Sequence, residues 1–203
     1  MGRRPGYEAA DARSKQAKRE GFAARSVYKL EEIDRRFNLL KRGSTVLDLG
    51  ACPGSWSQYA LVKVGPSGLV VAVDKKALPV ALPGAAVIEA DVFDLDEATL
   101  RAAAGDRVPP FDAVISDMAP RTTGVPFGDH VRSVELCDRA LDLACRWLKP
   151  GGSFVCKVFQ GEDEPALRAR IKARFGRVKA LKPDGTRSQS VEHFLVGTGF
   201  RPG

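Results

Sequence analysis

Hydrophobic residues recur along this chain in two alternating patterns. Short apolar runs predict five strands, at Thr45–Leu49, Leu69–Val73, Ala86–Glu89, Phe111–Ser116 and Ser153–Phe159. Helical stretches separate most of these runs. The clearest is Val131–Leu148, where apolar residues return every three or four positions, and another follows Ser26 as far as about Phe37. Strand–helix alternation indicates an α/β fold with a mostly parallel sheet covered by helices on both faces.

The two ends of the chain depart from this alternation. Residues 1–22 are polar and basic, and we expect a mobile N-terminal arm there, followed by a single domain over 23–200. A helix near Pro165–Phe175 precedes strand-like segments at Val178–Leu181 and Val191–Thr198, which predict an antiparallel hairpin at the sheet edge. The polar segment Arg121–Asp129 is the best candidate for a lid or substrate loop.

The distribution of charge along the chain bears on the kind of binding partner. The 203 residues carry a net charge of +7, yet residues 1–42 alone hold 12 basic and 6 acidic residues. A basic arm on a nearly neutral body favours an anionic partner, and Arg168–Arg187 form a second basic cluster. A solvated helix face is the alternative for each cluster.

Cysteine spacing and hydropathy argue against a metal-binding, membrane-spanning or exported protein. Four cysteines without C-x-x-C spacing and two histidines argue against a metal site. No apolar run reaches the length of a membrane span, and no export signal is visible. We therefore expect a cytoplasmic monomer with no metal and no membrane partner.

The segment Asp48–Trp56 follows the first predicted strand and precedes a helix. Gly50 and Gly54 allow a sharp turn and a close approach to a ligand. The three-glycine pattern of pyrophosphate-binding loops is missing, and Pro53 has no N–H to donate. The loop therefore favours an adenosyl ligand without a pyrophosphate, namely S-adenosylmethionine (SAM), over a nicotinamide dinucleotide.

Charged residues stand at the carboxyl ends of the predicted strands, where α/β sheets bind ligands. They are Asp48, Asp74, Asp91, Asp117 and, within the fifth strand, Lys157. Asp74 lies 24 residues after Gly50, at a distance suited to the ribose hydroxyls of an adenosine, and Asp91 could accept from the adenine amino group. Taken alone, Asp74 or Asp91 could equally be a turn residue.

Lys157 and Glu192 are predicted to interrupt apolar strand faces. Lysine inside an apolar strand is costly unless it is paired or functional. Glu192 alternates with Phe194 and Val196, so an acid shares an apolar face. Both positions invite a functional interpretation.

These residues occur within blocks that resemble the FtsJ/RrmJ (RlmE) family of ribosomal RNA large-subunit 2′-O-methyltransferases. The blocks include Ala24–Leu30, Leu47–Gln58, Ser116–Pro120, Gly151–Gly161 and the segment from Lys182 to Glu192, and the resemblance runs from about Tyr7 to Thr198. It implies a Rossmann-like methyltransferase sheet of seven strands, the last antiparallel. It also implies SAM-dependent 2′-O-methylation of a uridine in the A-loop region of 23S rRNA in the large ribosomal subunit.

The resemblance also implies roles for individual residues. The family's Lys-Asp-Lys-Glu tetrad maps onto Lys29, Asp117, Lys157 and Glu192, with Lys157 as the base that takes the ribose proton. The cofactor contacts map onto Asp48, Gly50, Cys52, Pro53, Gly54, Trp56, Asp74, Asp91 and Asp117. The basic residues expected to hold RNA are Arg13, Lys15, Lys18, Arg19, Arg25 and Arg187.

Some features leave alternatives open. Cys52 and Ser55 stand where many members have Ala and Gly, and Lys75–Ala86 matches the family poorly, which weakens the assignment of Asp91. A 2′-O-methyltransferase for tRNA or another rRNA site would carry the same tetrad. A catalytically idle RNA-binding assembly factor is the alternative from another class, and the intact tetrad argues against it.

Overall fold

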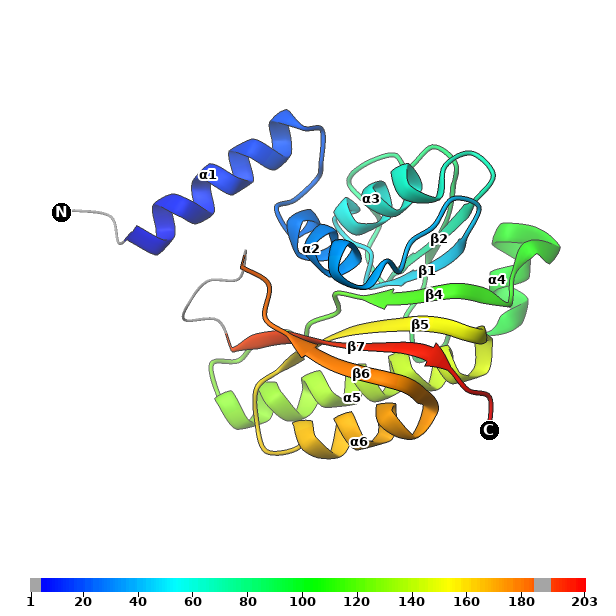
Figure 1. The fold of residues 1–203 in the computed structure, drawn as a ribbon. Coiled ribbons are helices and arrows are strands. Elements are labelled where there is room, and N and C mark those ends of the chain that lie inside the picture. Colours follow the sequence, from blue (N-terminus) through cyan, green and yellow to red (C-terminus); the bar gives the residue numbers. More distant parts are fainter. Residues whose placement is uncertain (1–4, 185–190) are drawn as a thin grey trace.

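The computed structural model describes residues 5–184 and 191–203, which form a twisted seven-stranded sheet with helices on both faces (Figure 1). The strands are β1 (Thr45–Leu49), β2 (Leu69–Asp74), β3 (Ala85–Glu89), β4 (Phe111–Ser116), β5 (Leu148–Phe159), β6 (Phe175–Leu181) and β7 (Glu192–Phe200). Their order in the sheet is β3-β2-β1-β4-β5-β7-β6. The pairs among β1 to β5 are parallel, and β7 is antiparallel to both β5 and β6. The predicted fold class and C-terminal hairpin are confirmed, with β7 inserted between β5 and the edge strand β6.

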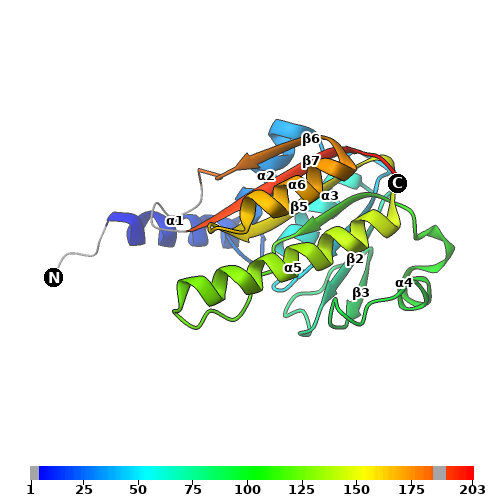
Figure 2. The same ribbon diagram turned by 90° about the horizontal axis from the view of Figure 1, so that it is seen from below.

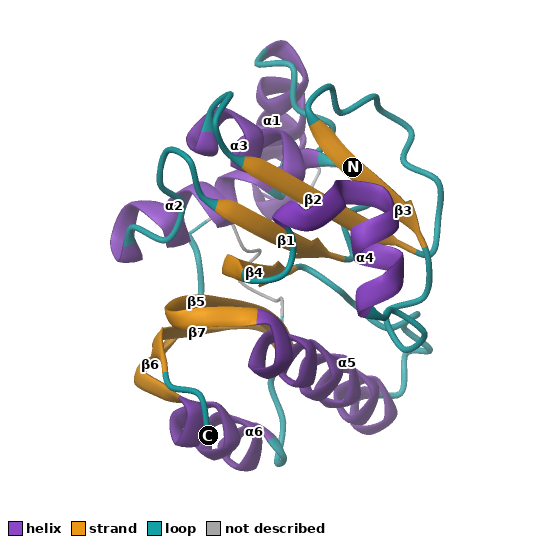
Figure 3. Cartoon of the chain, turned by 90° about the vertical axis from the view of Figure 1, so that its right-hand side faces the viewer, coloured by secondary structure: helices purple, strands orange, loops and turns teal. Residues whose placement is uncertain are grey.

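Two layers of helices cover the sheet. The helices are α1 (Pro5–Arg19), α2 (Val27–Phe37), α3 (Ser55–Val64), α4 (Glu97–Ala104), α5 (Pro126–Trp147) and α6 (Glu164–Arg174). Figures 2 and 3 show α5 and α6 together on one side of the sheet, away from α2 and α3. Strand alternation explains the division: Val46 and Val70 pack with the α2–α3 layer, whereas Leu47 and Val71 pack with α4, α5 and α6.

The N-terminal arm is helical over Pro5–Arg19, where the sequence predicted only a polar, mobile segment. This helix extends away from the sheet (Figure 1). Its described part carries a single fully buried apolar side chain, Ala17, so no apolar stripe marks it as a helix. The link to α2 is anchored on α3, because Gln58 accepts a hydrogen bond from the Ala23 N–H and donates one to the Gly21 carbonyl.

The loop predicted at Arg121–Asp129 is shorter than expected, since α5 begins at Pro126. Proline suits the first helical position because that position needs no intrahelical N–H bond. The Asp129 carboxylate accepts hydrogen bonds from the N–H groups of Thr123 and Gly124 and so folds the loop back onto the helix.

Among residues 5–184 and 191–203, no helix is long and apolar enough to cross a membrane. Within the same ranges, no group of three or more histidine, cysteine, aspartate or glutamate side chains could hold a metal ion.

Candidate active site

A cavity of about 520 Å³ opens at the carboxyl ends of the parallel strands. Five of the residues expected at the strand ends line it: Gly50, Asp74, Asp91, Asp117 and Lys157. Parallel strands bring their carboxyl ends to one edge of the sheet, which is why residues so far apart in sequence meet there. Apolar side chains of Met118, Val92 and Leu136 form part of the wall. The cavity therefore combines carboxylates with an apolar surface.

Two glycines shape the loop after β1. Gly50 has a φ of +78°, and a Cβ there would lie 2.4 Å from the Met118 Cγ atom. Gly54 has a φ of +114°, and its Cβ would lie 2.6 Å from Val80 Cγ2. Both positions need glycine for conformation and for space, which explains why the loop motif carries it twice.

Asp74 braces that loop from the end of β2. Its Oδ2 accepts a hydrogen bond of 2.9 Å from the Cys52 N–H, and its Oδ1 accepts one of 2.9 Å from the Lys76 N–H. Each carboxylate oxygen has a second lone pair, so Asp74 can still accept from ligand hydroxyls while it fixes the loop. Asp91 is arranged similarly, with Oδ1 accepting from the Phe93 N–H at 3.1 Å.

Asp48 lies beneath the cavity floor and does not line it. Its side chain is fully buried, Ser57 donates to Oδ2 at 2.6 Å, and Oδ1 has no hydrogen-bond partner among the described residues. Burial raises the pKa of Asp48 to about 7, and the nearby carboxylates of Asp117 and Asp74 contribute to the rise.

Lys157 and Asp117 meet at one end of the cavity. Lys157 Nζ lies 2.9 Å from Asp117 Oδ1 and donates a hydrogen bond to the Asp117 backbone carbonyl. The lysine side chain is 8% exposed, so little water reaches the amine. A nearly buried amine held by a carboxylate and a carbonyl has a fixed position facing the pocket.

Lys29 and Glu192 form a second ion pair, between α2 and the start of β7. Lys157 pairs with Phe194 across the β5–β7 ladder, and Lys29 Nζ lies 5.8 Å from the centre of the Phe194 ring. Glu192, two residues before Phe194, points to the same face as Lys157. The predicted tetrad therefore forms two ion pairs, and Lys157 and Glu192 lie on the same face of the sheet. Lys157 and Asp117 line the cavity, whereas Lys29 and Glu192 are not among its lining residues.

Comparison with known proteins agrees with this geometry. The family model described as FtsJ-like methyltransferase matches residues 22–200. This chain belongs to the FtsJ-like methyltransferase family.

Curated relatives match this chain over nearly its whole length and over nearly the whole of their own. Ribosomal RNA large subunit methyltransferase E of Bdellovibrio bacteriovorus is 52% identical over 94% of this chain and 97% of its own length. The enzyme of the same name from Nitratidesulfovibrio vulgaris is 49% identical over 91% of this chain and 90% of its own. A crystal structure of a ribosomal RNA methyltransferase from Plasmodium falciparum has a TM-score of 0.77 and 26% identity, covering 88% of this chain and 98% of that one.

Several residues expected at the cofactor lie elsewhere in this FtsJ-like methyltransferase. Trp56 is 2% exposed, stacks near Phe194 at 5.6 Å between ring centres, and donates its indole N–H to the Ser26 carbonyl. Ser55 shares a hydrogen bond with Ser26. Pro53 and Gly54 form the turn, and neither is among the residues lining the cavity. This end of the motif docks the segment that carries Lys29.

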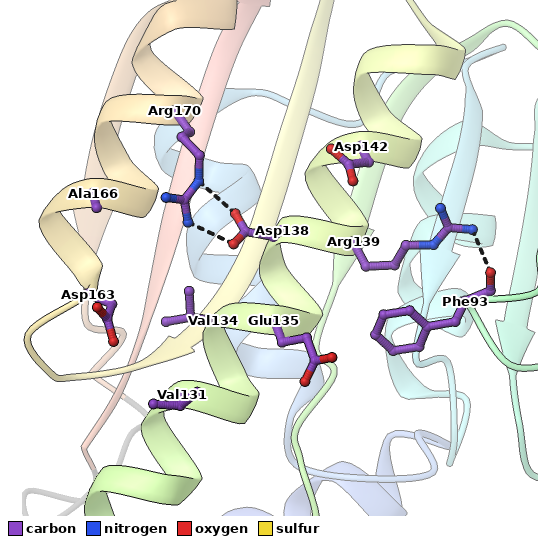
Figure 4. A pocket seen from close by; sticks show the side chains of 10 residues that line it. All are labelled: Phe93, Val131, Val134, Glu135, Asp138, Arg139, Asp142, Asp163, Ala166 and Arg170. Carbon is purple, nitrogen blue, oxygen red and sulfur yellow. Dashed lines mark hydrogen bonds and ion pairs between the residues drawn. The ribbon is translucent and has the colours of Figure 1, made fainter.

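The methyltransferase pocket also contains residues that the sequence analysis missed, among them Phe93 and Arg132, while Arg121 belongs to the predicted lid or substrate loop. Phe93 follows Asp91 by two positions, and Arg139 holds this segment in place. The Arg139 guanidinium donates to the Phe93 carbonyl at 3.0 Å (Figure 4). It also donates to the carbonyls of Val92 and Leu95 at 2.8 and 3.3 Å. Nothing in local sequence links Arg139 to a loop more than 40 positions earlier.

A larger hollow of about 600 Å³ lies on the outer side of Phe93, between α5 and α6. Its acidic residues include Asp138, whose two carboxylate oxygens accept hydrogen bonds from Nε and Nη2 of Arg170 at 2.9 and 2.7 Å (Figure 4). None of the four tetrad residues lines it. The hollow is therefore larger than the cavity at the strand ends but lacks the predicted catalytic residues, which makes the smaller cavity the candidate active site.

The expected RNA-binding residues occupy the arm and its link to the body. Lys15, Lys18 and Arg19 are exposed on α1, Arg13 is half-buried on the same helix, and Arg25 lies just before α2. Arg187 lies outside the described residues.

Proposed function

We propose that this chain transfers a methyl group from SAM to a ribose 2′-oxygen of large-subunit ribosomal RNA. The observation that carries the proposal is the placement of Lys157 and Asp117 on the wall of a cavity that also contains Asp74 and Asp91. Lysine and aspartate thereby stand next to a pocket suited to an adenosyl group. The names of the curated relatives support ribosomal RNA as the substrate.

The residues of the cavity suit SAM. Asp74 would accept from the ribose hydroxyls and Asp91 from the adenine amino group, while Met118, Val92 and Leu136 supply apolar contacts for the adenine ring. The close approach of Gly50 to Met118 leaves no room for a side chain at the turn and keeps backbone atoms at the cavity wall. Bound SAM supplies an electrophilic methyl group on a sulfonium.

Lys157 is the proposed base for the ribose hydroxyl. A 2′-hydroxyl is a weak acid, so a group must take its proton as the oxygen attacks the methyl carbon, and a positioned base contributes roughly 10²–10⁴ in rate. The Asp117 carboxylate, whose Oδ1 lies 2.9 Å from Lys157 Nζ, would stabilise the ammonium that forms when the amine takes this proton. The Lys157–Asp117 ion pair corresponds to the state in which Lys157 holds the proton.

Lys29 and Glu192 are proposed to position the ribose. They lie on the same face of the sheet as Lys157, and Lys29 is brought there by α2, directly after the basic arm. The exposed cations of α1 are proposed to hold RNA phosphates beside the site. A ribosomal substrate would put the reaction in the cytoplasm.

Mapping 2′-O-methyl groups in cells lacking the gene tests this function. We expect one large-subunit rRNA position to lose its methyl group, and the wild-type chain but not Lys157→Ala to restore it. The uridine implied by the family resemblance is the first position to inspect. Loss of a tRNA methyl group would identify a sister enzyme. Restoration of ribosome assembly by both chains, with no change in methylation, would identify an idle assembly factor.

A further inference from the structure

Apolar side chains are exposed in the segment that connects two parts of the cofactor cavity. Arg121 at its start and Arg132 at its end both line the cavity, and the residues between them are not among the lining residues, so this segment runs beside the cavity. Within this segment the side chains of Val125 and Phe127 are 59% and 69% exposed. Core packing therefore does not explain a phenylalanine at position 127, whose ring is largely in contact with water.

Asp129 holds the backbone of this segment in one conformation. Its Oδ1 accepts from the Thr123 N–H at 2.9 Å and from the Thr123 hydroxyl at 3.1 Å, and its Oδ2 accepts from the Gly124 N–H at 3.2 Å. Arg132 donates to both Asp129 and the Thr123 hydroxyl. These hydrogen bonds, the Thr123 amide first, lower the pKa of Asp129 and keep it ionised. Val125 and Phe127 are thus presented by a fixed turn.

Basic residues line part of the same cavity. Arg121, Arg132, Lys75 and Lys76 lie in its wall together with four carboxylates, and Arg132 is paired with Asp129. Positive charge that can hold phosphates, combined with an exposed aromatic face on which a base can stack, is the combination by which proteins bind single-stranded nucleic acid. The basic residues and the exposed aromatic ring together favour single-stranded nucleic acid as the ligand of this surface.

We propose that Phe127, supported by Val125, stacks on an unpaired nucleobase of the RNA beside the ribose that is methylated. This inference rests on the proposed function and adds a feature of the substrate. A base inside a duplex has both faces covered by its neighbours, so the nucleotide at Phe127 is unstacked from its own strand. The methylated ribose accordingly lies in a loop, a bulge or a strand end.

Four substitutions at one position test the stacking. Loss of one base–aromatic stack weakens binding about 5- to 150-fold. We therefore expect Phe127→Ala and Phe127→Leu to bind protein-free large-subunit rRNA that much more weakly and to raise the KM for RNA. Phe127→Tyr and Phe127→Trp should stay near wild type. All four should bind SAM normally. Val62→Ala is the matched control, since Val62 is 75% exposed on α3 and does not line the cavity.

Phe127→Trp also provides a direct signal. The native tryptophans, Trp56 and Trp147, are 2% and 1% exposed, so an exposed indole at position 127 can be followed separately. We expect RNA to quench its fluorescence, and to quench it less when the bases of a single-stranded probe are replaced by abasic sites.

Three results would overturn the stacking proposal. If the wild-type chain methylates RNA and Phe127→Ala binds RNA with normal affinity, Phe127 does not stack on a base. The proposed function is then unaffected. Wild-type behaviour of Phe127→Leu shows apolar contact without stacking. A defect confined to assembled subunits identifies a ribosomal protein as the occupant. Absence of RNA methylation by the wild type rejects the proposed function itself.

Discussion

The two sides of the cavity are assembled over very different distances along the chain. On the cofactor side, the Cys52 N–H bonds to Asp74, 22 positions later, and both follow neighbouring strands. On the tetrad side, Lys157 meets the Asp117 carbonyl across 40 positions at the cavity wall, and Lys29 meets Glu192 across 163 positions beyond the lining residues. The cofactor side is set by short strand–turn–helix units. The tetrad side exists only after β7 has inserted beside β5 and α2 has docked above it.

This difference predicts that cofactor binding and methyl transfer can be lost separately. The largest expected effect is that of Lys157→Ala, which removes the proposed base and should reduce single-turnover methyl transfer by roughly 10²–10⁴-fold. SAM affinity should change little, because Lys157 is assigned to the RNA hydroxyl. Single-turnover methylation with matched calorimetry of SAM binding measures both. Near-wild-type transfer would remove Lys157 from the base role.

The second prediction concerns Asp48, which is fully buried in β1. Asp48 has a pKa of about 7 in the folded chain and about 3.9 when unfolded, so the folded state binds more protons between these values. The free energy of unfolding should therefore fall as the pH rises from about 4 to 7 and level off above, by about 4 kcal/mol at most. Asp48→Asn should remove this slope. Denaturant unfolding of both chains at pH 5 and 8 checks it, and parallel pH profiles would contradict it.

The third prediction concerns Asp74. Asp74→Ala removes charge-assisted hydrogen bonds to the ligand ribose and should weaken SAM binding by roughly 1.5–3 kcal/mol. Calorimetry with SAM and NAD, on the wild type and the variant, measures the loss and the ligand class together. Tight binding of NAD by a wild-type chain that ignores SAM would overturn the assignment of the cofactor.

The fourth prediction separates RNA binding from both sides of the cavity. Replacing Arg13, Lys15, Lys18 and Arg19 with Ala should weaken RNA binding and flatten its dependence on salt, by roughly 0.7–0.9 in log–log slope for each phosphate that the arm no longer neutralises. SAM binding should be unaffected, since none of these four residues is among those that line the cavity. Unchanged affinity and slope would make the arm a solvated helix and leave Arg168–Arg187 as the leading RNA surface.

The smallest expected effect is that of changing Trp56, which connects α3 to the segment before α2. Trp56→Phe keeps a ring beside Phe194 but removes the hydrogen bond to the Ser26 carbonyl, at a cost of roughly 0.5–1.5 kcal/mol in stability. Because Ser26 directly precedes α2, methyl transfer should fall more than SAM affinity does. A selective loss of SAM affinity would return Trp56 to the cofactor contacts.

Residues at strand ends were the most predictable part of the site. Asp74, Asp91, Asp117 and Lys157 follow from strand alternation and from the rule that ligands bind at the carboxyl edge, and all four line the cavity. Trp56 shows the limit of this reasoning. Sequence proximity to the glycine loop cannot reveal that its indole faces α2, because that depends on long-range packing.

Helix boundaries and long-range hydrogen bonds were harder to predict from the sequence. The pattern predicted a helix from Val131, whereas α5 begins at Pro126, where proline suits the first helical position and Asp129 ties the preceding loop to the first turns. In the part of α1 whose side chains are described, Ala17 is the single fully buried apolar residue, so an apolar face could hardly be detected there. Arg139 reaches three carbonyls of a distant loop, and no local periodicity encodes such a contact.

The central claim, transfer of a methyl group to a ribose oxygen, is tested most directly by the chemistry of the product. A 2′-O-methyl group removes the nucleophile that cleaves RNA in alkali. Large-subunit rRNA methylated by the wild-type chain with labelled SAM should therefore give labelled, alkali-resistant dinucleotides, and Lys157→Ala should give almost none. Label recovered in alkali-released mononucleotides would place the methyl group on a base and contradict the account.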